Sequence, residues 1–192
     1  GDLLLIDQVI ENDNRVNHLE IELDEACNQI IAKRQPTAVD LRMISTVQKT
    51  ITDLERIGDE AKKIAKTAKQ LHTTGSNFTP QIRLAHIATA VVDMLRTSLD
   101  AYARLDTISA AQVVRQDKEV DAEFKGIMRQ LITYMMEDPR TISQSIELMF
   151  VAKSVERIGD HAKNIAEYVV YMVKGRDVRH TSLEEIEREA TR

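Results

Sequence analysis

The chain contains few of the residues that extracellular, β-rich or nucleic-acid-binding proteins depend on. It has one cysteine, no tryptophan, three prolines and six glycines in 192 residues, and aromatic residues make up 4%. A single cysteine, Cys27, cannot close an internal disulfide, which is typical of a protein kept in a reducing cytoplasm. So few aromatic rings leave almost no stacking platform for single-stranded nucleic acid. So few glycines and prolines disfavour a β-rich fold, because such a fold needs many turns.

Long apolar runs are also missing. A membrane-spanning helix needs about 20 consecutive apolar residues, whereas the longest apolar run here is 168–173. The 26 Lys and Arg against 31 Asp and Glu give a formal net charge of -5, which disfavours nucleic-acid phosphates and favours cations or basic partners. The start at Gly1 shows no basic segment followed by an apolar one, as a signal peptide would. We therefore expect a soluble, acidic, intracellular protein.

The chain does have a sustained helical periodicity, with apolar residues three and four positions apart. Thr79 before Pro80 and Asp138 before Pro139 are typical of helix starts, and Gly75 and Gly175 are typical of helix ends. No segment alternates with period two for long enough to indicate a sheet. The pattern predicts an all-α fold with helices over 2–34, 38–72, 80–104, 107–136 and 140–174, and a short one over 183–189.

An internal repeat is the strongest feature of the sequence. Residues 55–66 and 156–167 share nine of twelve amino acids at an offset of 101, where ordinary composition would give about one. Upstream, 2–17 matches 106–121 at an offset of 104. The change of offset means that one half carries three extra residues, near 24–27. The chain is therefore predicted to contain two copies of one helical packing unit.

The repeat divides the chain into two units and a tail. We expect a first unit at 1–76, a second unit at 77–175 and a charged C-terminal tail at 176–192. Each full unit would be a three-helix bundle, and the pair a six-helix molecule. The helix over 80–104 has no counterpart before Asp2, so the first unit is predicted to lack its first helix. Its apolar groove would then be exposed or filled by another molecule.

Pairs of carboxylates lie beside the apolar seam of the last helix in each unit. Glu55 and Asp59, and likewise Glu156 and Asp160, are spaced i, i+4 and lie one residue beyond a seam position. Like charges at this spacing repel, so each pair needs a compensating cation from Arg, Lys or a metal ion. Gly58 lies on the same seam, as does Gly159, and we expect a neighbouring helix to approach closely there, because glycine costs about 1 kcal/mol within a helix.

The middle helix of each unit offers complementary acids. Asp117 lies within the apolar stripe of 107–136, where burial is costly unless the carboxylate is paired or coordinated, and Asp121 follows one turn later. In the first unit the equivalent stripe carries acidic or amide side chains at steps of four, three and four: Asp13, Asn17, Glu20 and Asp24. If antiparallel neighbours bring each stripe against its own pair, oxygen ligands converge. Such sites suit Mg²⁺, Mn²⁺ or iron and can bridge several ions.

A simpler interpretation is that these acids form solvated ion pairs, Asp59 with Lys62 or Lys63 and Asp160 with Lys163. The bundle would then be a metal-free scaffold. A helical-bundle carboxylate oxidase is a third hypothesis, but such enzymes use Glu-x-x-His elements, and glycine follows each glutamate at that spacing. His161 is expected on the surface. No glycine-rich phosphate loop, nucleophile elbow or HExxH pattern indicates an enzyme.

Several motifs together resemble the PhoU family of phosphate-transport accessory proteins. They are the doubled Glu-Arg-Ile-Gly-Asp element, the stretches 31–36 and 134–139, and the ending 174–180. The resemblance covers nearly the whole chain and departs from the family mainly at the start. It implies two three-helix bundles, a non-enzymatic protein, and often a homodimer.

The resemblance also implies a function and partners. Members are regulators of phosphate uptake that hold the phosphate-starvation response off when phosphate is plentiful. Their implied partners are the ATPase subunit of the phosphate ABC transporter and a membrane sensor histidine kinase. The expected protein is therefore a cytoplasmic, metal-binding adaptor between transporter and kinase.

The family resemblance further implies multinuclear metal clusters held by E/D-xxx-D pairs. Carried over to this sequence, the ligands are Glu55, Asp59, Asp117, Asp121, Glu156 and Asp160. Asp13 matches the remaining pair, but Asn17 replaces its second acid, so this site would be weaker or would borrow Glu20 or Asp24. Asp100 is a further candidate. Whether the metal is iron, manganese, zinc or magnesium stays open.

Overall fold

The computed structural model describes residues 2–73 and 78–192, and within these ranges the regular structure is entirely helical. The prediction of an all-α fold is therefore confirmed. The helices are α1 (Leu3–Arg34), α2 (Ala38–Thr73), α3 (Leu84–Arg104), α4 (Thr107–Glu137), the 3₁₀ turn η1 (Pro139–Thr141), α5 (Ile142–Lys174) and α6 (Leu183–Thr191). No helix in the described ranges combines the length and apolar character that a membrane crossing requires.

Side-chain caps and left-handed residues mark the helix ends. Asp106 accepts hydrogen bonds from the backbone N–H groups of Ile108 and Ser109 at the start of α4, and Asp138 accepts one from Arg140 at the start of η1. Gly175 ends α5 with a φ of 74°, a conformation that glycine adopts without a steric penalty. The predicted boundaries at Asp138 and Gly175 are confirmed, whereas Gly75 and the expected unit boundary at 76 lie outside the described residues.

The start of α3 corrects the sequence prediction. The helix begins at Leu84 instead of residue 80, so Thr79 and Pro80 do not form its N-terminus. The preceding segment is bonded to α4: the backbone N–H of Gln81 donates to the Tyr134 hydroxyl, and Gln130 Nε2 donates to the Gln81 carbonyl at 2.7 Å. These contacts take the place of a first helical turn.

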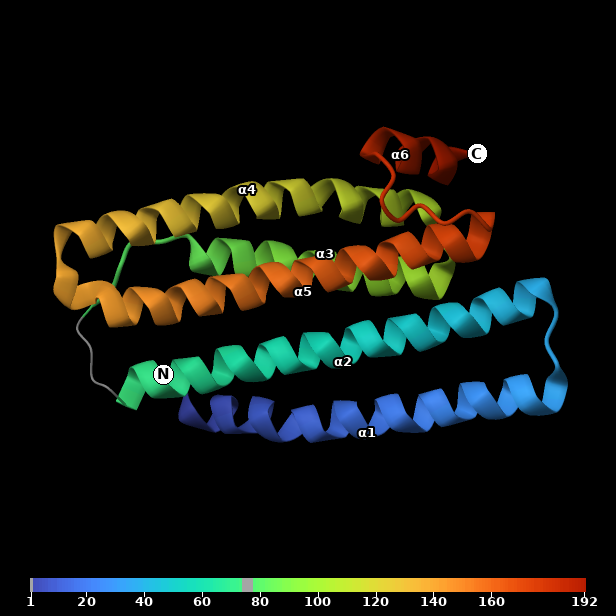
Figure 1. Cartoon of the computed structure of the whole chain (residues 1–192), viewed down its shortest axis with the longest axis horizontal. Coiled ribbons are helices and arrows are strands. Elements are labelled where there is room, and N and C mark those ends of the chain that lie inside the picture. Colours follow the sequence, from blue (N-terminus) through green and yellow to red (C-terminus); the bar gives the residue numbers. More distant parts are fainter. Residues whose placement is uncertain (1, 74–77) are drawn as a thin grey trace.

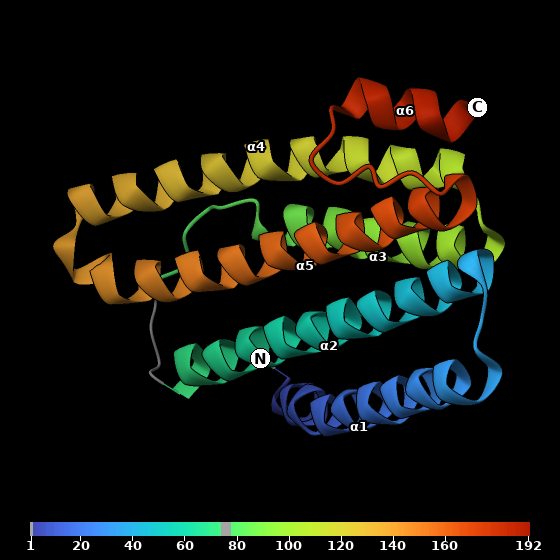
Figure 2. The ribbon, with the colours of Figure 1, turned by 45° about the vertical axis from the view of Figure 1, so that its right-hand side comes forward.

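The helices form a hairpin beside a three-helix bundle (Figure 1). Helices α3, α4 and α5 pack on one another, and the α1–α2 hairpin joins them through contact between α2 and α5. Helices α2 and α5 lie side by side and run in opposite directions. Helix α6 lies across the outer side of α4 near the C-terminal end of α5 (Figure 2).

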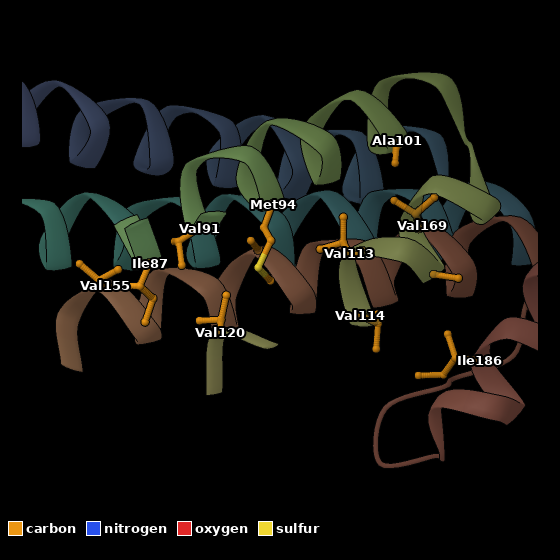
Figure 3. Packing of buried hydrophobic residues seen from close by; sticks show 14 of the residues in the cluster. Ile87, Val91, Met94, Ala101, Val113, Val114, Val120, Val155, Val169 and Ile186 are labelled. Carbon is orange, nitrogen blue, oxygen red and sulfur yellow. The ribbon is translucent and has the colours of Figure 1, made fainter. Parts of the chain in front are cut away.

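The main core lies between α3, α4 and α5. Val91 and Met94 of α3 meet Val120 of α4 and Val155 of α5 there (Figure 3). An ideal Cβ built on Gly159 would lie 3.4 Å from Val91 and 3.6 Å from Val120, and one on Gly58 would lie 3.5 Å from Val16. A neighbouring helix thus packs at ordinary van der Waals distance from both positions, and the expectation that it approaches so closely that glycine is required is wrong for Gly58.

The C-terminal segment belongs to the same core. Val178, Ile186 and Ala190 are buried, and Ile186 of α6 lies beside Val114 of α4 (Figure 3). The Thr107 hydroxyl donates a buried hydrogen bond to the Ala190 carbonyl at 2.7 Å. The predicted charged tail therefore also contributes apolar side chains that attach it to the core.

Helix α1 buries few of its side chains against the rest of the structure. Only Asp13 and Cys27 are buried on α1. Large apolar side chains are exposed along this helix: Leu3, Leu4, Leu5, Leu19, Ile21, Leu23 and Ile30.

Candidate functional site

Helices α4 and α5 bring four of the predicted carboxylates into one electrostatic group, the second acidic cluster, made of Asp117, Asp121, Glu156 and Asp160. Asp117 is only 4% exposed and Glu156 is also buried. The pKa of Asp160 is raised to about 6, first by burial and then by the negative charges of Glu156 and Asp117, with a smaller contribution from Asp121. The acids of the α4 stripe thus lie near enough to the α5 pair to act on the charge of Asp160.

Two lysines supply the positive charge in this cluster. Lys163 Nζ donates to Asp117 Oδ2 at 2.7 Å, and Lys153 pairs with Glu156. Burial alone would lower the pKa of Lys163, but the hydrogen bond to Asp117 and its charge outweigh burial and raise that pKa. The simple ion-pair interpretation assigned Asp160, on the same helix, as the partner of Lys163. In the structure Lys163 instead bonds Asp117 on α4.

Helices α1 and α2 build the first acidic cluster from Asp13, Glu20, Glu55 and Asp59. Asp13 is 3% exposed and accepts a hydrogen bond from Lys62 Nζ through Oδ2, while its buried Oδ1 has no hydrogen-bond partner. The pKa of Glu55 is raised, first by burial and then by the charges of Asp59, Glu20 and Asp13. A buried carboxylate oxygen without a partner is costly, so a further donor or a cation at Asp13 Oδ1 would stabilise this cluster.

The two clusters share three repeat-equivalent acids, whereas Asp121 corresponds to Asn17 and Glu20 to Phe124. Lys62 and Lys163 differ by 101 positions, and Asp13 and Asp117 by 104, which are the two offsets of the repeat. Each lysine reaches across to the aspartate of the neighbouring helix in its own unit. Lys62 thus bonds Asp13, and Lys63 bonds Glu60, so neither forms the expected pair with Asp59.

Two of the predicted ligands lie away from the clusters. Asp24 is engaged at the other end of α1, where it accepts hydrogen bonds from Gln48 Nε2 at 2.8 Å and from Asn28 Nδ2 at 3.0 Å. Asp100 is exposed on α3. Asn17, the residue in place of an acid, is held by its own helix, since its Nδ2 lies 3.5 Å from Asp13 Oδ2.

The chemistry of both clusters fits a hard cation. Their ligands are carboxylate oxygens, which suit magnesium, manganese or iron, and a metal ion would relieve the repulsion that raises the pKa values of Asp160 and Glu55. In residues 2–73 and 78–192, the arrangement does not bring three His, Cys, Asp or Glu side chains within common reach of one ion. Lys62 and Lys163 instead balance Asp13 and Asp117 in this arrangement.

The interface between the two units contains polar residues that the sequence analysis missed. His161 is buried, so the expectation that it lies on the surface is wrong. Its Nδ1 lies 2.6 Å from Oδ1 of Asp53, a buried residue of α2 that also accepts a hydrogen bond from Asn164. The sequence carried one signal for this contact, because His161 and Glu60 occupy equivalent positions of the repeat and both are buried.

Glu60 makes the equivalent contact at the other end of the interface. It pairs with Lys63 and with Arg157 of α5, each at 3.0 Å. Burial would raise the pKa of Glu60, but hydrogen bonds from Lys63 and Ser154 together with both positive charges hold it below its ordinary value. The two units are thus joined through two buried acids, Asp53 and Glu60.

Comparison with known proteins identifies the family to which this arrangement belongs. The sequence profile of the PhoU domain matches residues 1–68 and 84–169. The chain belongs to the PhoU family. The phosphate-specific transport system accessory protein PhoU of Escherichia coli K12 is 48% identical over 185 residues, which cover 96% of this chain and 76% of that protein. The PhoU homolog of Pseudomonas aeruginosa has the same identity and coverage.

Solved PhoU structures have the same fold. The crystal structure of PhoU from Pseudomonas aeruginosa superimposes with a TM-score of 0.88 at 47% sequence identity, covering 91% of this chain and 84% of that one. The phosphate transport system regulatory protein PhoU from Streptococcus pneumoniae gives a TM-score of 0.84 at 25% identity, covering 92% and 83%. The PhoU fold, with its helical repeats, therefore positions both acidic clusters.

Proposed function

We propose that this PhoU-family protein regulates phosphate transport as a metal-binding adaptor. It would bind the ATPase subunit of the phosphate transporter and a sensor histidine kinase, and would hold phosphate-starvation signalling off when phosphate is plentiful. The named relatives, which are accessory and regulatory proteins of phosphate transport, support the general role. The observation that supports metal binding is the presence of two acidic clusters in one chain that share three repeat-equivalent acids.

In this proposal Asp117, Asp121, Glu156 and Asp160 would hold metal in the second unit. Asp13, Glu20, Glu55 and Asp59 would do so in the first. Bound metal would neutralise the charge of each cluster. Lys62 and Lys163 supply part of the positive charge by bonding Asp13 and Asp117.

The chain's own residues connect the two clusters. Each cluster has half of its acids on α2 or α5, and these two helices are held together by Asp53 with His161 and by Glu60 with Arg157. A change in the angle between α4 and α5 would therefore reach α2 through these contacts. This arrangement supports a partner surface that depends on the state of the clusters.

The test is binding of the purified protein to the two partners from the same organism. The transporter ATPase subunit and the cytoplasmic part of the sensor kinase are each titrated with the protein, with Mn²⁺ or with a chelator. We expect binding to both partners, weakened at least several-fold by the chelator. Equal affinity in the two conditions would show that metal does not control the adaptor, and binding to neither partner would refute the adaptor role.

A further inference from the structure

The contact between α2 and α5 has an internal two-fold relationship. Exchanging each residue for its repeat equivalent converts the pair Asp53–His161 into Ser154–Glu60, and both pairs interact in the structure. Helices α2 and α5 are antiparallel (Figure 1), so the residues around one pair have repeat equivalents around the other, and we call these two regions the equivalent grooves. Differences between these grooves show what each can accept.

One groove is filled by aromatic side chains of the chain itself. Tyr168 of α5 is buried and Tyr171 is half-buried. Lys49 Nζ of α2 lies 5.7 Å from the ring centroid of Tyr168 and 5.6 Å from that of Tyr171, at cation–π distance. In this groove, two rings and a cation occupy the space between the helices.

Within the described residues 2–73 and 78–192, the equivalent groove is open. Thr67 and Gln70 of α2 occupy the positions that correspond to Tyr168 and Tyr171. A hollow of about 310 Å³ lies here between α2 and α5, with Thr67 and Lys63 on one side and Phe150 on the other. The open groove thus lacks the rings that fill its counterpart.

The rim of the open groove is cationic. Lys63 and Arg157 pair with the buried Glu60, and Lys153 pairs with the buried Glu156, while about half of each cationic side chain stays exposed. Glu60 and Glu156 are buried below these cationic side chains and fix their positions through the ion pairs. A partner that approaches this face therefore meets positive charge first, although the whole chain has a net charge of -5.

An apolar stripe continues from the same rim along α5. Phe150 is 62% exposed, and Ile146 and Ile142 follow at intervals of four residues and are also exposed. Large aromatic side chains at this exposure are typical of sites that bind other proteins. The groove therefore combines an apolar wall, fixed cations and a space for a ring.

We propose that the groove lined by Lys63, Thr67, Phe150, Lys153 and Arg157 binds an acidic segment of a partner protein and takes up an aromatic side chain from it. That ring would occupy the space that Tyr168 and Tyr171 fill in the equivalent groove, and carboxylates beside it would meet the cationic rim. This inference specifies a partner chemistry for the adaptor role and rests on that role.

The test uses a defined peptide and the full chain. The probe is a fluorescein-labelled acidic peptide with two tyrosines three residues apart, flanked by glutamates, and its binding is followed by fluorescence anisotropy. Matched peptides carry alanine for both tyrosines or glutamine for the glutamates. We expect saturable binding of the first peptide, weakened about tenfold in each matched peptide, as for loss of an anchoring aromatic or a charge pair.

Variants of the protein place the binding in the groove. Thr67→Tyr keeps every cation and fills the hollow with a ring of the chain itself, so it should lower the affinity for the peptide about tenfold. Phe150→Ala and Lys153→Glu should lower this affinity to a similar extent. Lys33→Glu, the same charge change on exposed α1, is the control and should leave affinity within about twofold. The proposal would be overturned if the peptide did not bind at concentrations up to about 1 mM, a dissociation constant that corresponds to a binding free energy of about 4 kcal/mol. It would also be overturned if the Thr67→Tyr variant bound the peptide as tightly as the unchanged protein does.

The same variants separate this proposal from the adaptor role. If the transporter ATPase and the kinase bind the Thr67→Tyr and Phe150→Ala variants as tightly as the unchanged protein, the groove proposal fails and the adaptor role stands. If neither protein binds the unchanged chain, the adaptor role fails whatever the peptide does.

Discussion

Replacing Glu167 by glutamine should stabilise the protein, and the gain should depend on pH. Glu167 of α5 is 7% exposed and faces a hollow of about 320 Å³ between α4, α5 and the segment that leads to α6. Its pKa is raised from 4.5 to about 7, chiefly by burial, while the charges of Lys163 and Arg179 offset part of this effect. The folded state therefore binds this proton more tightly than the unfolded state does.

The sign and magnitude follow from this difference in pKa. Because the folded pKa is the higher one, ionisation of Glu167 costs folding free energy as the pH rises from 4.5 to about 7, and the cost is constant above that. At about 1.4 kcal/mol for each unit of pKa, the full cost is about 3 kcal/mol. Glutamine has similar size and carries no charge, so Glu167→Gln avoids this cost.

The measurement is urea unfolding of both proteins between pH 4.5 and 8.5 in the presence of a chelator. The stability difference should be a few tenths of a kcal/mol at pH 4.5 and about 3 kcal/mol at pH 8. Contributions of other titrating groups, Asp160 included, occur in both proteins and cancel. Glu119→Gln, at an exposed position of α4, is the control and should show no such trend. A difference that is independent of pH, or a less stable variant at pH 8, would refute the reasoning.

Three further predictions concern the fold. Asp53→Ala and His161→Ala each remove one partner of the buried pair and should each lower the free energy of unfolding by about 3 kcal/mol. The double variant should lose clearly less than the sum of the two; additive losses in urea unfolding would show that the pair does not interact. Gly58→Ala should raise stability by up to about 1 kcal/mol, because the new Cβ meets only ordinary contacts of 3.5 Å and longer; a lower melting temperature would contradict this. Ile186→Ala should release α6, so amide hydrogens of 183–191 should exchange at least tenfold faster while those of α1 keep their rates; unchanged exchange in α6 would show that Ile186 is not its anchor.

The sequence was sufficient to predict the helices and the acidic pairs. Periodicity gave the fold class, and the repeat singled out Glu55, Asp59, Glu156 and Asp160 because carboxylates recurred at the same place beside an apolar seam. The stripe that contains Asp117 was found for the same reason, since an aspartate interrupts an otherwise apolar pattern. These are properties of single helices, which periodicity describes well.

The sequence could not predict contacts that depend on how separate helices are placed. The lysine partners were wrong because a flexible side chain reaches either its own helix or the next one, and Lys62 and Lys163 reach across. His161 was missed because its partner, Asp53, lies 108 residues away in the other unit. The late start of α3 was missed because hydrogen bonds to Tyr134 and Gln130 replace the first turn.

The number of Mn²⁺ ions bound per chain, measured by equilibrium dialysis and elemental analysis, tests the central claim most directly. Compared with the unchanged protein, Asp13→Asn with Asp59→Asn should lose the metal of the first cluster only, and Asp117→Asn with Asp160→Asn that of the second only. Retention of metal by the opposite cluster in each variant would confirm two separate sites. An unchanged protein that binds no metal, or variants that bind as much as it does, would contradict the account.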